Sequence, residues 1–115
     1  SMFKDMLGQS EEDEEMAYLM ELEAHFVPQE NFAATYLFMI DGKKKPLTIE
    51  VHSDDLRVHY GQAEKIDVYT KLTPSVMDNI IQGRMSFQRA FMTGEMTAKG
   101  NFKTLKMLDQ IFIFN

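Results

Sequence analysis

The stretch SFQRAFMTGEMTAKGNF, residues 86–102, contains two glycines six positions apart, Gly94 and Gly100, among bulky phenylalanine and methionine side chains. A phosphate-binding loop requires the spacing G-x-x-x-x-G, followed directly by Lys and then Ser or Thr. Here the glycines are one residue too far apart, and no such Lys-Ser/Thr pair follows. The alternation of Met96 and Ala98 predicts a short strand instead, so the glycines mark the turns at its two ends.

The residues before this stretch predict a helix followed by a sheet. Ser10, ahead of an acidic run, is typical of a helix start, and Pro28 follows the helix predicted over 11–26. Apolar residues then alternate in three segments, with breaks at 41–45 and 53–55 that predict an antiparallel meander, and a fourth segment follows. The apolar face predicted for the helix consists of Met16, Leu19, Met20 and Phe26.

The first predicted strand, within residues 32–40, is apolar on both of its faces. Leu37 and Met39 project from the side opposite to Tyr36 and Phe38. A central strand that is buried on both faces explains this pattern, and so does a patch used for dimerisation. The apolar tail 111–114 is a second candidate for contact with another subunit, or for closing a cavity.

The remaining residues predict three helices around the strand between the glycines. Thr73 is the expected N-cap of a helix over 75–82, with Pro74 in its first turn, and a short helix follows over 86–92. We expect a single domain over 1–115, in which the opening Ser-Met is a tag remnant. A closing helix from Asn101 has an apolar stripe formed by Phe102, Leu105, Leu108, Ile111 and Phe112.

Composition narrows the function. The 115 residues include no cysteine, carry a net charge of −6, and contain no apolar run near the roughly 20 residues that span a bilayer. Neither a secretory signal nor a disulfide is expected, and we expect a cytoplasmic location. The acidic charge argues against nucleic acid as a partner. Basic residues nevertheless concentrate in 83–107, either as a solvated helix face or as a patch that orients the domain on an anionic membrane surface.

No group of residues has the spacing of a catalytic or metal site. His25, His52 and His59 lack a ligand spacing, although the last two share a predicted face that could hold a metal weakly. No nucleophile with an adjacent base is evident, and Tyr36 is the one attractive polar group in the predicted core. We therefore expect no cofactor and no catalysis. Ten methionines and nine phenylalanines favour a deformable apolar cavity.

From about Ala34 to the end, the chain resembles the sterol carrier protein type two family. Members typically contain the block Gly-Lys-Leu-x-x-x-x-Ala-Phe-Met-x-Gly-Lys-Leu-x-Ile-x-Gly, and residues 83–100 read GRMSFQRAFMTGEMTAKG. The resemblance implies an α+β fold: a five-stranded, mostly antiparallel sheet with helices on one face and an apolar tunnel between the layers. That tunnel would hold a sterol, a fatty acyl chain or a similar lipid. The implied tunnel residues are Phe38, Met77, Ile81, Met85, Phe87, Phe91, Met96, Phe102, Leu105, Leu108 and Phe112.

The sequence departs from the family in three places. Lys103-Thr104-Leu105 replaces small residues of the last helix and can narrow the tunnel, and Asp54 or Asp55 stands where a turn glycine is usual. The chain ends in Asn115 rather than in a peroxisomal Ser-Lys-Leu signal. The leading hypothesis is non-catalytic carriage of a lipid. The alternative is a dimeric interaction module, or an accessory scaffold, with a filled core.

Overall fold

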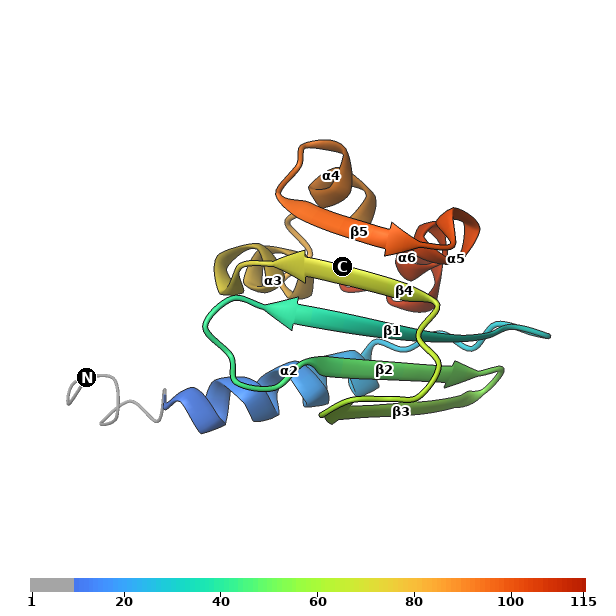
Figure 1. Ribbon diagram of the computed structural model, residues 1–115, viewed down its shortest axis with the longest axis horizontal. Coiled ribbons are helices and arrows are strands. Elements are labelled where there is room, and N and C mark those ends of the chain that lie inside the picture. The colour runs from blue at the N-terminus through green and yellow to red at the C-terminus, as the bar shows by residue number, and fades with distance from the viewer. Residues whose placement is uncertain (1–9) are drawn as a thin grey trace.

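The computed structural model describes residues 10–115, so the predicted tag remnant lies outside the described part. Its centre is a five-stranded sheet in the order β3-β2-β1-β4-β5 (Figure 1). Every neighbouring pair is antiparallel except β1 and β4, which are parallel, so the prediction of a mostly antiparallel α+β fold is confirmed. The strands are β1 (Ala33–Ile40), β2 (Leu47–His52), β3 (Asp55–Tyr60), β4 (Val68–Leu72) and β5 (Met96–Gly100).

The parallel pair arises where the chain leaves the edge strand β3 and crosses to the far side of β1. Asp67, directly before β4, fixes this crossing by two hydrogen bonds with Thr35 of β1. Its backbone N–H donates to the Thr35 carbonyl at 2.9 Å, and its carboxylate accepts from the Thr35 N–H at 2.8 Å. The strand predicted at 66–72 therefore pairs with the first strand of the meander rather than extending the meander.

The helices lie together on one face of the sheet (Figure 1). Thr73 caps the second of them as predicted, since its hydroxyl accepts a hydrogen bond from the Val76 N–H at 3.2 Å. The predicted closing helix is wrong in one respect, because it breaks at Met107 into two short helices. The helices are α2 (Glu11–Ala24), α3 (Pro74–Ile81), α4 (Phe87–Met92), α5 (Phe102–Lys106) and α6 (Leu108–Ile111).

The core lies between the sheet and these helices. Phe38 from the central strand and Phe87 from α4 meet there edge to face, with ring centroids 5.8 Å apart. Strand β1 is central, and Leu37 is buried on the opposite side of it, beside Thr48 and Tyr69 of the neighbouring strands. The interpretation of a strand buried on both faces is confirmed for Leu37, whereas Met39 is 41% exposed.

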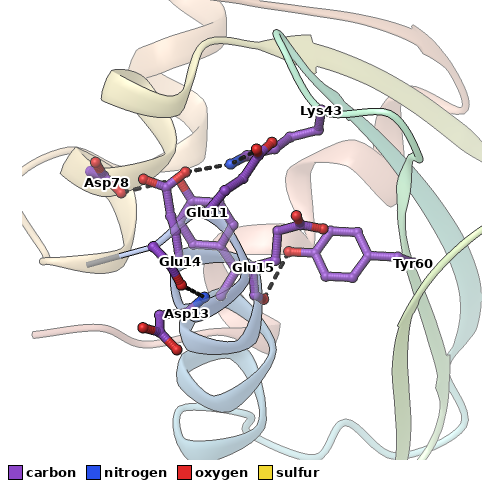
Figure 2. Close-up of polar contacts among 9 residues, drawn as sticks. Glu11, Asp13, Glu14, Glu15, Lys43, Tyr60 and Asp78 are labelled. Carbon is purple, nitrogen blue, oxygen red and sulfur yellow. Dashed lines mark hydrogen bonds and ion pairs between the residues drawn. The ribbon is translucent and has the colours of Figure 1, made fainter. Parts of the chain in front are cut away.

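The apolar face predicted for the first helix is wrong for Met16 and Met20, whereas Leu19 and Phe26 are partly buried against the core. Tyr18 and Leu22 are buried, while Met16 and Met20 are more than half exposed. Residues two apart on a helix differ by about 200°, so a helix that buries Tyr18 turns both methionines outward. Polar contacts fix this orientation. The Tyr18 hydroxyl donates to Asp78 at 3.2 Å. Figure 2 shows that the hydroxyl of Tyr60, from β3, donates to the Glu15 carbonyl of the helix.

The C-terminal tail packs against its own chain. The Val27 N–H donates to the Ile111 carbonyl at 2.7 Å, and the Ile113 N–H donates to the His25 carbonyl at 3.1 Å. Ile111 and Phe112 are buried and Ile113 is 44% exposed, so little of the tail is exposed for contact with another subunit. The tail pairs with the residues after α2 because both segments are extended there and leave backbone groups free to bond.

Of the two glycines of the 86–102 stretch, Gly94 is a turn residue, as predicted, whereas Gly100 is the last residue of β5 and pairs with Val68. Gly94 has φ +79° and Gly100 has φ +124°, conformations that residues with a side chain rarely adopt. Gly94 precedes the edge strand β5, and Gly100 ends it, between α4 and α5. Within residues 10–115, no helix is both long enough and apolar enough to cross a membrane.

Candidate functional site

A cavity of about 110 Å³ opens between α4 and α5 and is almost entirely apolar. Phe87 and Phe91 line it from α4, and Phe102 and Leu105 line it from α5. Four of the residues implied by the family resemblance therefore meet at one cavity, which we call the α4–α5 pocket. The pocket is completed by Gln88, Met92, Lys106 and Asp109.

A smaller cavity of about 50 Å³ lies directly beyond the α4–α5 pocket, toward β4 and β5. The two cavities share three walls: Phe91, Phe102 and Leu105. The rings of Phe91 and Phe102 meet edge to face, with centroids 5.4 Å apart and an interplanar angle of 82°. Joined together, the cavities would match the ~150 Å³ of an engineered cavity that holds benzene. Rotation of either ring would therefore open space for a ligand group of that size.

Hydrogen bonds hold both helices of the pocket in place. Ser86 caps α4 by accepting from the Arg89 N–H at 3.0 Å, and Asn101 caps α5 by accepting from the Thr104 N–H at 3.0 Å. Asp109 ties α6 to α4, because its carboxylate accepts from the backbone N–H groups of Phe87 and Gln88 at 2.8 and 2.9 Å. Hydrogen bonds thus fix the first residues of both short helices, and the side chains between the helices do not fill the pocket.

Tyr36, the one catalytic candidate from the sequence, anchors α5 to the sheet. Its hydroxyl donates to the Thr104 carbonyl at 2.6 Å, and its side chain is fully buried. Burial, and to a lesser extent the charge of Asp67, raises the pKa of this hydroxyl well above its usual range. A neutral phenol that is already donating a hydrogen bond suits a structural role, and it does not line the α4–α5 pocket.

The other implied tunnel residues do not share one cavity. Ile81 lines a groove beside α2, whereas Met85 and Phe112 line a separate cavity of about 140 Å³ next to the C-terminal tail. Phe102 is 57% exposed, so its place in the apolar stripe of a buried closing helix was wrong. The tunnel candidates that are packed in the core away from the α4–α5 pocket are Phe38, Met77, Met96 and Leu108.

Sequence reasoning missed four residues of the pocket. Met92 follows Phe91 in the quoted block, and its position in that block was the available signal. Gln88 and Lys106 belong to no recognisable sequence pattern, and they line the pocket only because α4 packs against α5. Asp109 was not identified because its role depends on a contact with helix α4 that is 21 or 22 residues distant in sequence.

A depression of about 630 Å³ between α2 and α3 is of a different kind. Its walls include Asp13, Glu14, Glu21 and Asp78, so it presents carboxylates. Figure 2 shows the polar contacts at the start of α2, where Lys43 binds Glu14 at 2.5 Å. Burying an apolar chain against ionised carboxylates would cost their solvation, so this groove does not suit a lipid.

The histidines are placed separately. His59 contacts Glu50 at 3.4 Å, His52 lies at the far end of the same hairpin, and His25 contacts Glu21 at 3.3 Å. Among residues 10–115, no group of three or more His, Cys, Asp and Glu side chains is arranged to hold a metal ion.

The sheet with helices on one face, and an apolar pocket at the edge of the helix layer, define a small α+β domain with a site for an apolar group. The chain belongs to the SCP-2 sterol transfer family, whose model matches residues 3–112. No curated protein sequence matches it.

Solved structures show the same fold at low identity. Palmitated SCP2L2 from Aedes aegypti is 16% identical with a TM-score of 0.64, over 89% of this chain and 93% of that one. Apo sterol carrier protein 2 from Yarrowia lipolytica is 19% identical with a TM-score of 0.54, over 85% and 72%. The sec-alkylsulfatase Pisa1 from Pseudomonas is 21% identical with a TM-score of 0.60 over 70% of this chain, which spans only 13% of Pisa1.

Proposed function

We propose that this protein binds an apolar lipid, such as a fatty acyl chain or a sterol, and carries it without chemical change. The observation that carries the proposal is the α4–α5 pocket, where Phe87, Phe91, Phe102 and Leu105 enclose an apolar cavity. Family membership supports the class of ligand, and the palmitated form of SCP2L2 shows that a relative with this fold takes an acyl chain. A cytoplasmic location is part of the same proposal.

The size of the cavity determines how the ligand must bind. At about 110 Å³, the pocket can hold only the end of an acyl chain. Each buried methylene contributes about 0.8 kcal/mol, so four of them give about 3 kcal/mol before the costs of binding. Micromolar affinity needs about 8 kcal/mol, and the pocket must therefore extend. The shared wall of Phe91 and Phe102, and flexible methionine side chains nearby, provide the means.

The test is a calorimetric titration of delipidated protein with palmitate and, separately, with cholesterol. Saturable binding of either ligand is expected. Leu105→Trp should weaken it, because the larger side chain fills the pocket, whereas the exposed Met20→Trp on α2 is the matched control and should bind normally. Absence of saturable binding of both ligands by the natural chain would refute the proposal.

A second candidate is the interaction module or scaffold with a filled core. The outer face of the sheet favours it, because no helix within residues 10–115 covers that face and both Met39 and Tyr69 are at least 41% exposed there. Leu37 lies beneath them but is buried, and the tail 111–114 packs on its own chain, so contact would rest on Met39 and Tyr69. Native mass spectrometry separates the candidates: a monomer that carries lipid supports the first, and an empty dimer supports the second.

A further inference from the structure

His25, at the end of helix α2, has a hydrogen-bond acceptor beside each of its ring nitrogens. Its Nε2 lies 3.3 Å from a carboxylate oxygen of Glu21, and its Nδ1 lies 3.0 Å from the carbonyl oxygen of Ile113 in the C-terminal tail. A carbonyl and an ionised carboxylate can only accept. A neutral imidazole has one N–H and can satisfy one of these acceptors, whereas the protonated imidazolium donates to both. Both contacts are therefore hydrogen bonds only when His25 is protonated.

The contact with His25 is the last polar contact of the tail. The Ile113 N–H also donates to the His25 carbonyl, and among residues 10–115 neither Phe114 nor Asn115 forms a further hydrogen bond. The ring of Phe114 lies 5.3 Å from the imidazole, a distance at which a cation is attracted to an aromatic ring. The position of Phe114 thus depends on His25 and on stacking with Phe112.

Phe114 separates two spaces beside the tail. It lines the depression of about 630 Å³ between α2 and α3, which we call the α2–α3 groove. It also lines the cavity of about 140 Å³ next to the tail, which we call the tail cavity. His25 lines the groove side, whereas Ile80 and Met85 line the cavity side. Displacement of the Phe114 ring would therefore join the tail cavity to the groove.

The charged groups that line the α2–α3 groove with His25 are acidic. They are Asp13, Glu14 and Glu21 from α2 and Asp78 from α3. Residues 111–115 of the tail have no ionisable side chain. Glu14 is bound to Lys43, and Asp78 accepts from Tyr18, so Glu21 is the carboxylate in contact with His25. Among the described residues, no lysine or arginine lines the groove to compete with His25 for Glu21.

We propose that His25 is a pH-sensitive switch that holds Phe114 and the tail closed over the tail cavity. A histidine side chain changes its charge between about pH 5 and 8. At the acidic end of this range, His25 donates to Glu21 and to the Ile113 carbonyl together, and the tail stays closed. At the alkaline end, these two acceptors compete for one N–H, and Phe114 moves aside more often. The inference goes beyond the proposed function, because it concerns access to a different cavity and can be measured without a ligand.

Amide hydrogen exchange measured by NMR tests the switch, because the Ile113 N–H is bonded to the His25 carbonyl and is released when the tail opens. Protection factors are obtained at about pH 5.5 and about pH 7.5, each relative to an unstructured amide at the same pH. We expect the Ile113 protection to be about threefold higher at the lower pH, the effect of one half-exposed charged pair. The nitrogen chemical shifts of His25 show in the same sample whether both ring nitrogens carry protons. Equal protection at the two pH values would overturn the proposal.

Two variants separate His25 from other groups that titrate. His25→Gln keeps an amide donor for the Ile113 carbonyl but has no proton to gain, so the Ile113 protection should be the same at both pH values. His59→Gln is the matched control, because His59 also contacts a glutamate, Glu50 at 3.4 Å, but lies on the edge strand β3 rather than beside the tail. Its loss should leave the pH dependence of Ile113 unchanged. The proposal is overturned if His25→Gln retains the pH dependence or if His59→Gln removes it.

A cysteine placed in the tail cavity tests whether the switch controls access. The chain contains no cysteine, and Ile80 is buried in the wall of this cavity, so Ile80→Cys provides a single buried thiol. At about pH 5.5, dithiodipyridine should react with this thiol about threefold faster in the His25→Gln background than with His25 present. At about pH 7.5 the two rates should be similar, and the pH dependence of the thiol itself cancels in each comparison. Equal rates at the lower pH would overturn the control of access, whatever the outcome of the palmitate titration.

Discussion

The buried Tyr18 and Tyr36, together with the partly buried Tyr60, should make this protein unfold at alkaline pH. The hydroxyl of Tyr18 donates to the Asp78 carboxylate, that of Tyr36 to the Thr104 carbonyl, and that of Tyr60 to the Glu15 carbonyl at 2.8 Å. Burial is the largest cause that raises the pKa of all three hydroxyls, and nearby carboxylates add to it. Each therefore stays protonated in the folded chain at a pH where an unfolded tyrosine ionises.

The sign and size follow from proton linkage. Since the folded pKa is raised, the full contribution to stability is present below the unfolded pKa of about 10 and is lost as the pH rises toward the folded pKa. Above pH ~10, each such tyrosine lowers the free energy of unfolding by about 1.4 kcal/mol per pH unit. Three together give about 4 kcal/mol per unit. A domain with ~5–15 kcal/mol of stability would lose it within roughly one to four pH units.

Urea unfolding followed by circular dichroism at closely spaced pH values measures this slope. Each of the variants Tyr18→Phe, Tyr36→Phe and Tyr60→Phe should reduce the slope of stability against pH by about one third. Each should also lower the free energy of unfolding near neutral pH, because the hydrogen bond of the hydroxyl is lost. The comparison between each variant and the natural chain is the decisive quantity. A slope that is the same in Tyr36→Phe as in the natural chain would refute the assignment of a buried, donating hydroxyl.

Four further substitutions test the helices of the pocket, each by urea unfolding. Gly100→Ala should lower the free energy of unfolding by about 3 kcal/mol, because its Cβ would lie 2.1 Å from the Asp67 carbonyl oxygen. Gly94→Ala should lower it by only about 1 kcal/mol, since nothing lies within 4 Å of that Cβ and only the left-handed backbone is strained. Equal costs would contradict this geometry. Asp109→Asn should cost about 2 kcal/mol by weakening two charge-assisted bonds to α4, and no loss would show that the cap is dispensable. Phe102→Ala should cost about 1 kcal/mol, since its ring is 57% exposed, and a loss of several kcal/mol would mean that the ring is buried.

Local chemistry made several elements predictable from the sequence. Thr73 before a proline has few roles other than a helix cap, and Gly94 at positive φ forms a turn that other residues rarely adopt. The apolar residues on both faces of the first strand predicted either that it was buried on two sides or that it formed an interface, and Leu37 is in fact buried. These inferences depend on neighbours in the chain, which a sequence displays directly.

Inferences that depend on packing between distant segments were less accurate. Met16 and Met20 are as apolar as the buried residues of α2, and contacts with Asp78 and with the sheet decide which side of the helix turns inward. Phe102 continues an apolar stripe in the sequence but lies at the surface beside α4. For the pocket, the sequence led only to the expectation of a tunnel between the sheet and the helices. The walls of the α4–α5 pocket come from two helices, and no local sequence pattern shows that these helices are in contact.

The edge-to-face pair of Phe91 and Phe102 is a partition with a space on each side. Such a partition means that the volume open to a ligand increases abruptly when a ring moves. Ligands short enough to end at the rings leave the wall closed, and each added carbon contributes equally until the first one that must displace a ring. A plot of affinity against chain length should therefore show a break rather than a straight line, and the carbon number at the break would measure the depth of the wall.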